Sequence, residues 1–460
     1  MSNSNLGLNR KVIKVLVDSL SDSDSKIYKD IMSITGEPSG EVDENDTLIN
    51  YLTDGTEVTT LTSNAVKKVA DNVFNGYNKL VTVNFPKATS IGVRSFQGCT
   101  SLNTVDFTNA KSLGNYAFKE CSNLRNVTIP NVETIGDWVF HKCTKIKVLT
   151  CTNVKTIGAS AFQGCYGLHD IDLPECTEIG PSAFYRCDYI ERINLPKVTV
   201  IPNSAFDTDT DNERLLTEVN LPNVTSIGDR AFYNCRNLTS IDLPNVTSIG
   251  NYAFLGCSNL TSIDLPNVTS IGDSAFLGCS NLTSIDLPNV TSIGENAFLG
   301  CRNLTSIDLP NVTSIGSQVF RGCTSLTSID LPNVTSIGEN AFTSCSNLTS
   351  IDLPNVTSIG ENAFSGCSNL TSIDLPNVTS IGEYAFYMCP KLSTVIILTN
   401  QIIPCEDMVF YGTPISNNTG YIYVPDSLVN SYKSTSDWPT YAIKPISELP
   451  QEYKTLYNIT

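Results

Sequence analysis

The chain has 460 residues, of which 41% are hydrophobic, and its formal net charge is −17. The hydrophobic content is sufficient for a buried core, and the negative charge argues against nucleic acid or an anionic membrane as a partner. No apolar run reaches the ~18 residues that a membrane-spanning helix needs. We therefore expect a folded protein that binds no nucleic acid and does not insert into a membrane.

Residues 1–60 do not repeat and are predicted to form an attachment or assembly region that contacts a larger assembly. Two short helices are expected, at 8–20 and 25–32, followed by a connector rich in Gly and Asp. The first apolar stretch is short and contains Lys14, which is typical of an amphipathic helix and not of a secretory signal. This favours a virion or the cytoplasm over classical secretion.

Residues 61–415 are built on a repeat of 22 residues, with a degenerate first copy at 63–74. The sequence LTSIDLPNVTSIG starts at Leu238 and recurs unaltered from residues 260, 282, 304, 326, 348 and 370. A fixed period of this length indicates a solenoid, in which each coil covers the next. We predict a mainly β stack of about 15 coils.

One copy, residues 260–281, predicts the structure of a coil. Apolar and polar residues alternate at 262–264, which is the pattern of a half-buried strand. Residues 268–271 are expected to form a second extended piece, and 273–278 a single helical turn that carries an Ala-Phe pair inward. One coil buries too few apolar side chains to be stable alone, so stacking supplies the core.

An insertion of four residues interrupts the period near 207–213. Asp207, Asp209 and Asp211 match the first three ligand positions of a calcium loop, and Glu218 falls at the twelfth. The alternative is an acidic surface bulge in one irregular coil, and the sequence does not decide between the two.

Two columns of the repeat are expected to serve the fold. Thirteen of the 16 cysteines occupy one core column and are predicted to be buried, reduced thiols. Asn245, Asn267 and Asn289 lie beside Pro in another column and are predicted to form a hydrogen-bonded amide ladder.

Residues 416–460 break the period and are predicted to cap the last coil. The aromatic residues Tyr421, Tyr423, Trp438 and Tyr441 suit such a cap because they combine apolar bulk with a polar group.

The pattern LxxIxLPxVxxIGxxAFxxCxx resembles the BspA-like (Treponema-type) leucine-rich repeat over residues 66–415. The resemblance implies a leucine-rich-repeat solenoid and a non-enzymatic surface protein of gut bacteria that adheres to host proteins or other cells. The repeat also occurs in phage-encoded proteins. Two departures are the unit of 22 residues instead of the usual 23, and the missing export signal.

Little in the sequence indicates catalysis. The two histidines, His141 and His169, are 28 residues apart and do not share a column. Glycine is found as single turn residues and not as a phosphate-binding loop. We predict no enzyme activity, no cofactor and no metal centre.

Two faces of the coil are candidate binding surfaces. The strand face carries a column of carboxylates that would attract basic partners, or would simply be solvated: Asp242, Asp264, Asp286, Asp308, Asp330, Asp352 and Asp374. The turn face, after the Ile-Gly pair, differs from copy to copy. A repetitive ligand favours the uniform strand face, whereas a unique ligand favours the turn face.

The sequence therefore predicts a non-enzymatic binding or adhesion protein that presents an extended repeat surface to a protein or surface polymer. It would be displayed on a cell surface or a virion, for example as an accessory or fibre protein of a phage. An intracellular interaction scaffold and a structural spacer are the alternatives.

Overall fold

The coil of residues 260–281 shows how the repeat folds in the computed structural model. Strand β21 (Ser262–Asp264) has a buried Ile263 between two exposed residues. Pro266 has no N–H group to donate and follows the strand. A second strand, β22 (Ser270–Ile271), buries Ile271. Both predicted extended segments are confirmed.

The structure describes the following residues: 40–42, 47–51, 58–64, 66–208, 215–435 and 438–456. The helices predicted at 8–20 and 25–32 lie outside this set. The same holds for residues 209–214, half of the predicted calcium loop of residues 207–218.

Residues 273–278 do not form the helical turn expected from the sequence. The N–H groups of Ser274 and Phe276 donate to the next coil, to the carbonyl oxygens of Glu295 and Ala297, with N···O distances of 2.8 Å. An α-helix would direct these donors back along its own backbone. The turn segment thus adds a third set of hydrogen bonds between coils.

Left-handed backbone explains why the turn segment is not helical. Ser274 has φ 54° and Gly278 has φ 75°. Glycine adopts this conformation freely, whereas an L side chain costs roughly 1 kcal/mol. The second of these positions is glycine in several coils of the uniform region: Gly256, Gly278, Gly300, Gly322 and Gly366.

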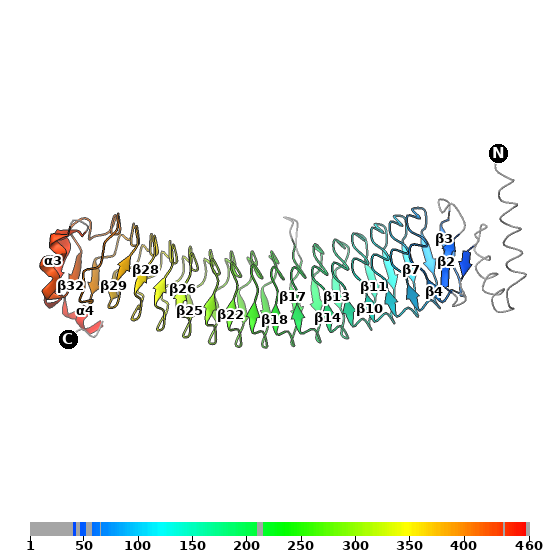
Figure 1. The fold of residues 1–460 in the computed structure, drawn as a ribbon, viewed down its shortest axis with the longest axis horizontal. Helices are drawn as coiled ribbons and strands as arrows, with labels where there is room; N and C mark the ends of the chain where they lie inside the picture. The colour runs from blue at the N-terminus through cyan, green and yellow to red at the C-terminus, as the bar shows by residue number, and fades with distance from the viewer. Residues whose placement is uncertain are drawn as a thin grey trace, which may run out of the picture. The chain divides into compact units, whose positions relative to one another are not determined.

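The chain divides into two compact units, Met1–Leu221 (unit 1) and Pro222–Thr460 (unit 2), each a stack of coils (Figure 1). In unit 1 the first strands of the coils are β3 (Thr60–Thr62), β5 (Thr82–Asn84), β7 (Thr104–Asp106), β9 (Asn126–Thr128), β11 (Val148–Thr150), β13 (Asp170–Asp172), β15 (Arg192–Asn194) and β17 (Glu218–Asn220). The second strands are β4 (Lys68–Val69), β6 (Ser90–Ile91), β8 (Ser112–Leu113), β10 (Thr134–Ile135), β12 (Thr156–Ile157), β14 (Glu178–Ile179) and β16 (Val200–Ile201).

Unit 2 repeats this arrangement. Its first strands are β19 (Ser240–Asp242), β21, β23 (Ser284–Asp286), β25 (Ser306–Asp308), β29 (Ser372–Leu375) and β31 (Thr394–Ile397), with single bridge residues at Asp330 and Asp352. In the C-terminal region β32 (Tyr421–Val424) and β33 (Ile443–Pro445) extend this ladder. Its second strands are β18 (Ser226–Ile227), β20 (Ser248–Ile249), β22, β24 (Ser292–Ile293), β26 (Ser314–Ile315), β27 (Ser336–Ile337), β28 (Ser358–Ile359) and β30 (Ser380–Ile381).

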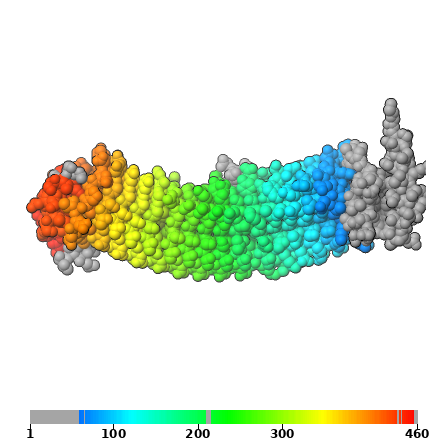
Figure 2. Space-filling model, viewed as in Figure 1, coloured from blue at the N-terminus to red at the C-terminus, as the bar shows by residue number. Residues whose placement is uncertain are grey.

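Neighbouring coils of a unit are in register, so that equivalent residues lie side by side. Ser240 pairs with Ser262 and Asp242 with Asp264, in parallel. In the core the rings of Phe254 and its equivalent in the next coil stack with centroids 5.4 Å apart. The space-filling view shows adjacent coils in direct contact (Figure 2). The predicted solenoid of 22-residue coils is confirmed.

The N-terminal coils are preceded by strands where the sequence suggested a connector. Strand β2 (Thr47–Tyr51) pairs in parallel with β4, and β1 (Gly40–Val42) pairs with β2 in antiparallel orientation. The edge of this ladder is therefore covered by a short reversed strand, which limits pairing with another chain.

Helices and aromatic residues follow the last coil. They are the α-helices α3 (Val429–Ser434) and α4 (Gln451–Leu456) and the 3-10 helices η1 (Asp426–Leu428), η2 (Thr440–Ala442) and η3 (Ile446–Glu448). Tyr423 packs with Ile396 and Leu449 in a buried cluster, and Trp438 is also buried. The predicted aromatic cap is confirmed, although Tyr441 is 52% exposed.

Among the helices that the structure describes, none has the length and apolar character needed to cross a lipid bilayer.

Candidate binding surface

The strand face of unit 2 presents a uniform polar surface. In β19, β21, β23 and β25 the Ser and Asp side chains are exposed on either side of a buried Ile. The hydroxyl of Thr261, just before β21, donates to the carbonyl oxygen of Thr239 in the previous coil at 3.0 Å. Hydroxyls and carboxylates are thereby arranged in straight columns along the coils.

The predicted carboxylate column is present on this face. Its first six members are exposed: Asp242, Asp264, Asp286, Asp308, Asp330 and Asp352. Like charges at roughly 5 Å repel each other by about 0.8 kcal/mol in bulk water. The column therefore forms an acidic stripe that would attract cationic groups.

Asp374, at the C-terminal end of the stripe, has a different environment. Its partner in the next strand is Ile396, a residue of the cap cluster, and the side chain is only partly exposed. Burial, followed by the charge of Asp352, raises the pKa of Asp374 to about 7. At neutral pH this carboxyl group is therefore partly protonated, and the negative stripe is weakened where the cap begins.

The stripe borders a shallow hollow in unit 2. It has a volume of about 430 Å³ and is lined by the Ser, Ile and Asp residues of β19, β21 and β23. Because the lining is the same in each of the three coils, the hollow has no unique constellation of side chains. A ligand with its own repeat would fit such a surface best.

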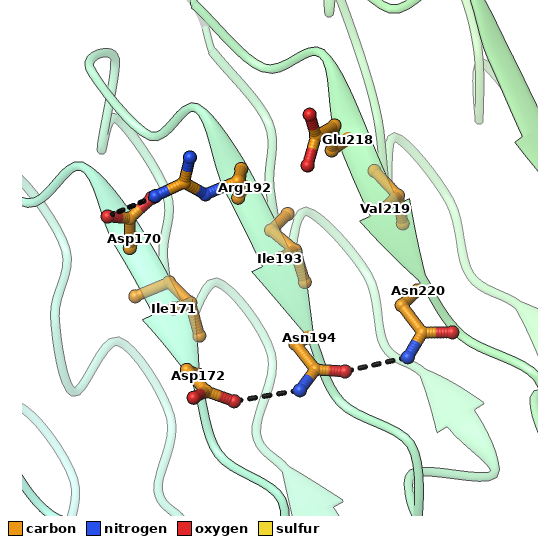
Figure 3. A pocket seen from close by; sticks show the side chains of 9 residues that line it. All are labelled: Asp170, Ile171, Asp172, Arg192, Ile193, Asn194, Glu218, Val219 and Asn220. Carbon is orange, nitrogen blue, oxygen red and sulfur yellow. Dashed lines mark hydrogen bonds and ion pairs between the residues drawn. The ribbon is translucent and has the colours of Figure 1, made fainter.

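A second hollow, of about 600 Å³, lies on the strand face of unit 1 over β13, β15 and β17 (Figure 3). Here the equivalent positions differ from coil to coil. The guanidinium of Arg192 pairs with the Asp170 carboxylate at 2.9 Å. Glu218 is next in this column, so the hollow carries both signs of charge.

The second column of this hollow is a directional chain of hydrogen bonds. The amide of Asn194 donates to the Asp172 carboxylate at 2.7 Å, and that of Asn220 donates to the Asn194 oxygen at 2.7 Å. The three side chains lie in a row across the strands (Figure 3). Carboxylates at these two positions would repel Asp172 and each other, and the neutral amides avoid this repulsion.

The sequence analysis did not single out the hollow of unit 1. The sequence does contain a sign of it, because the column that is Asp in the uniform copies is Asn at residues 194 and 220. That the substitutions form one connected polar surface follows only from the register of the coils.

The turn face contains residues that vary but also serve the fold. The side-chain oxygen of Asn251 accepts the N–H of Asp273, and the Asp273 carboxylate accepts the N–H of Glu295, at 2.8 and 2.9 Å. The first residue of the variable pair therefore links successive coils. Less of this face is available for a unique binding site than the sequence variation suggests.

The predicted column of buried thiols is confirmed. Fifteen of the 16 cysteines are buried and Cys405 is partly exposed, and none forms a disulfide. The Cys279 thiol donates to the carbonyl oxygen of Phe254 in the previous coil at 3.2 Å. Burial raises the pKa of Cys279 above its usual value.

The asparagine column is hydrogen-bonded, but not from amide to amide. Asn267 donates through Nδ2 to the carbonyl oxygen of Pro244 at 2.7 Å, and Asn289 donates to Pro266 in the same way. The strand ends at proline, and the carbonyl oxygen of this proline needs a hydrogen-bond donor. The asparagine side chain of the next coil provides one.

The histidines occupy unlike environments in unit 1. His141 is buried, with its ring centroid 4.7 Å from that of Trp138 in an edge-on contact, and burial lowers its pKa to about 4. His169 is exposed beside Tyr189, with Nδ1 2.9 Å from the Gly167 oxygen. His141 is therefore neutral at physiological pH.

The calcium hypothesis is tested only in part by the structure. Asp207 is buried and Glu218 lies exposed on β17, while Asp209 and Asp211 fall outside the described residues. Within the described part of the chain, no group of three His, Cys, Asp or Glu side chains is placed to hold a metal ion.

Comparison with known proteins agrees with this architecture. The family described as the BspA type leucine rich repeat region matches residues 54–153, 89–213, 210–327 and 291–417. The chain belongs to the BspA-type leucine-rich-repeat family. The resemblance found in the sequence is thus confirmed. No curated protein matches the chain.

Several solved structures are similar to this BspA-type protein. A leucine-rich repeat protein from Bacteroides ovatus has a TM-score of 0.62 and 27% sequence identity, and the match covers 79% of this chain and 94% of that chain. A leucine rich cell surface protein from Faecalibacterium prausnitzii has a TM-score of 0.36 and 27% identity, with 74% and 93% covered. A leucine-rich repeat protein from Eubacterium ventriosum has a TM-score of 0.40 and 21% identity, with 80% and 95% covered.

Proposed function

We propose that the protein is a non-enzymatic binding or adhesion protein whose strand face holds a protein or a surface polymer. The observation that carries the proposal is the acidic stripe, in which exposed carboxylates recur in parallel register from coil to coil. Each coil offers the same small set of groups. Such a surface gains strength by repetition, since each added contact raises the effective concentration for the next one.

The chemistry of the stripe supports a basic or hydroxyl-rich ligand. Carboxylates accept hydrogen bonds and attract ammonium and guanidinium groups, while Ser and Thr hydroxyls can donate or accept. The net charge of −17 adds long-range attraction for a cationic partner. In unit 1, the hollow over β13 to β17 offers a second and more individual contact.

The proposal extends to the place of the protein in the cell. Residues 1–60 would attach the protein to a larger assembly, and residues 416–460 would close the stack. Display on a cell surface or on a virion, for example as a phage accessory or fibre protein, fits a protein whose repeats bind outward. An intracellular scaffold would use the same surface on a different partner.

Deletion of two coils, residues 282–325, tests the proposal because it preserves the frame of the repeat. The full chain and the deletion variant are applied to arrays of immobilised proteins and polysaccharides, and affinities are measured for each ligand that the full chain binds. The proposal expects affinity to fall progressively as coils are removed. Unchanged affinity indicates a spacer, and all-or-none loss indicates a single site.

A matched pair of variants locates the binding face. The first variant removes three charges from the stripe by changing Asp to Asn at three positions: Asp286, Asp330 and Asp352. Changing three exposed glutamates to Gln removes the same charge from the turn face: Glu295, Glu339 and Glu361. Binding through the strand face is contradicted if the second variant loses as much affinity as the first.

A further inference from the structure

An exposed cluster of large apolar side chains lies near the C-terminal end of unit 2. Met388, Met408, Tyr411 and Tyr441 are 49%, 53%, 52% and 52% exposed. Over residues 253–387, all of which the structure describes, no other large hydrophobic side chain is exposed to this degree. We call these four residues the apolar patch.

The two methionines of the patch stand where the backbone disfavours them. Met388 has φ 54° and Met408 has φ 57°, both in the left-handed region. The backbone is left-handed at these two positions in other coils as well. The position of Met388 is glycine in coils such as that of Gly278, and the position of Met408 is Asn or Ser in some coils and a larger residue such as Tyr252 in others. Because both side chains are exposed, packing in the core does not offset the cost of the left-handed backbone. The fold imposes the left-handed backbone, but it does not require methionine at either position. Two large, exposed apolar side chains there are a reason to look for a function.

The patch borders a hollow with aromatic walls. It has a volume of about 310 Å³, and Phe410, Tyr411, Trp438 and Tyr441 line it together with Met408, Cys405 and Glu406. The walls are held in place by hydrogen bonds. Trp438 donates through Nε1 to the Ile403 oxygen at 2.9 Å, and the Tyr441 hydroxyl donates to the Ser416 oxygen at 3.0 Å. A ligand would meet a surface that is already formed.

One carboxylate lines the hollow, and two more are exposed on the adjoining coils. Glu406 lines the hollow, and Glu383 and Asp407 are exposed nearby in the same two coils. The backbone N–H of Tyr384 donates to the backbone carbonyl oxygen of Asp407 at 3.1 Å, which places the two coils side by side. Aromatic faces and carboxylates together attract guanidinium and ammonium groups.

We propose that the apolar patch and its hollow are a docking site for a segment of a partner protein that carries Arg or Lys beside an apolar or aromatic residue. Tyr, Trp and Met are enriched in the cores of protein interfaces, and Met adapts its shape to different contacts. The acidic rim selects the positive charge. A second copy of this chain is a poorer occupant, because a two-fold interface would place identical acidic rims against each other.

The site is separate from the strand face, and a double variant tests it. Met388→Gly with Met408→Asn restores residues that suit left-handed backbone and removes the apolar contacts. A display library of random peptides is selected on the full-length protein, with counter-selection on the double variant. We expect the enriched peptides to combine Arg or Lys with aromatic or aliphatic residues, and to bind the variant at least about tenfold more weakly.

Thermal unfolding separates docking from a structural role. Because the variant relieves backbone strain, its melting temperature should be unchanged or higher. A lower melting temperature would assign the methionines to the fold and overturn the proposal. Tyr252→Ser, which changes another exposed residue with φ 59°, is the control and should bind the selected peptides normally.

Cys405 offers an independent measurement in the same experiment. It lines the hollow and is the partly exposed thiol, while the other 15 cysteines are buried. A bound peptide should slow its reaction with a maleimide. The proposal is overturned if no enriched peptide slows the reaction, if the enriched peptides are acidic, or if the protein dimerises through the patch in sedimentation.

Discussion

The strand faces of β13 to β17 in unit 1 and β19 to β25 in unit 2 have the same backbone and the same buried columns but different surfaces. In unit 1 the exposed positions carry Asp, Arg, Glu and Asn, which form an ion pair and an amide ladder across the strands. In unit 2 they carry only Ser and Asp. The residue between them is Ile or Val in unit 1 and Ile in unit 2, and it is buried except at Val219, which is partly exposed.

This comparison separates what the fold requires from what is available for binding. The buried Phe and Ile columns are retained where the surface changes, and so are the buried Cys and the glycine after Ile, except in the coil of Phe206, which has Asp209 and Pro202 at these positions. Stability therefore depends on contacts between coils in the core, and the strand face can vary without loss of the fold. A uniform face suits repetition in the ligand, and a varied face suits one particular partner.

The largest expected effect tests whether both units depend on the same core contacts. A Cβ on Gly180 or Gly272 would approach backbone atoms of the previous coil at 2.5 and 2.6 Å, too close for either coil to accommodate. Gly180→Ala and Gly272→Ala should each destabilise the protein by roughly 3 kcal/mol or more, measured by denaturant unfolding.

Gly316→Ala is the matched control, because it is in the same column but a Cβ there meets only side chains, at 3.7 Å or more. It should have a much smaller effect. Similar losses for all three variants would contradict the role assigned to close packing between coils.

The second prediction concerns Asp374, at the C-terminal end of the carboxylate stripe in unit 2. The folded-state pKa of Asp374 is raised from 3.8 to about 7, so the folded protein binds this proton more tightly than the unfolded chain. Its contribution to stability is greatest at low pH and is lost as the pH rises from about 4 to about 7. Asp374→Asn should remove this loss and stabilise the protein at pH 8 by about 1–2 kcal/mol, after allowance for partial solvation.

Thermal melts of both proteins across this pH range measure the effect. Asp286→Asn, at an exposed position of the stripe, is the control for the loss of one carboxylate. Parallel profiles for wild type and Asp374→Asn would show that burial at the cap does not perturb this carboxyl group.

A smaller effect is expected when the surfaces of the two units are exchanged at one position. Asn194→Asp removes the donor to Asp172 and introduces a like charge, so it should destabilise by about 1 kcal/mol at low salt. Asp264→Asn makes the reverse change in unit 2 and should stabilise by up to about 1 kcal/mol.

Both differences should shrink in about 1 M NaCl, because exposed charges are screened. Unfolding midpoints at low and high salt provide the measurement. An effect of Asn194→Asp that is independent of salt would point to the lost hydrogen bond alone and not to charge repulsion.

The last prediction concerns the buried thiols of both units, which should not react while the protein is folded. Under native, non-reducing conditions a thiol reagent should modify about one cysteine, Cys405, and in denaturant it should count close to 16. Rapid modification of several thiols in the native state would show that the coils of one unit open. A count near zero in denaturant would mean that the cysteines are oxidised.

Much of the architecture could be predicted from the sequence because each coil repeats the same local signals. The alternation at residues 262–264 predicted a strand, and the fixed period of 22 placed the Phe and Cys columns in the core. Copies that share a pattern must share an environment in a stack, so the sequence alone predicts the column cysteines to be buried thiols.

Only the tertiary structure decided the features that depend on the neighbouring coil. Residues 273–278 are not helical because their donors are satisfied across the stack, and Asp374 is unusual because Ile396 lies beside it. The polar hollow over β13 to β17 and the apolar patch near the cap also join residues from different coils. A local pattern specifies which side chains face inward, but which surface groups meet depends on the register between coils and on where the repeat ends.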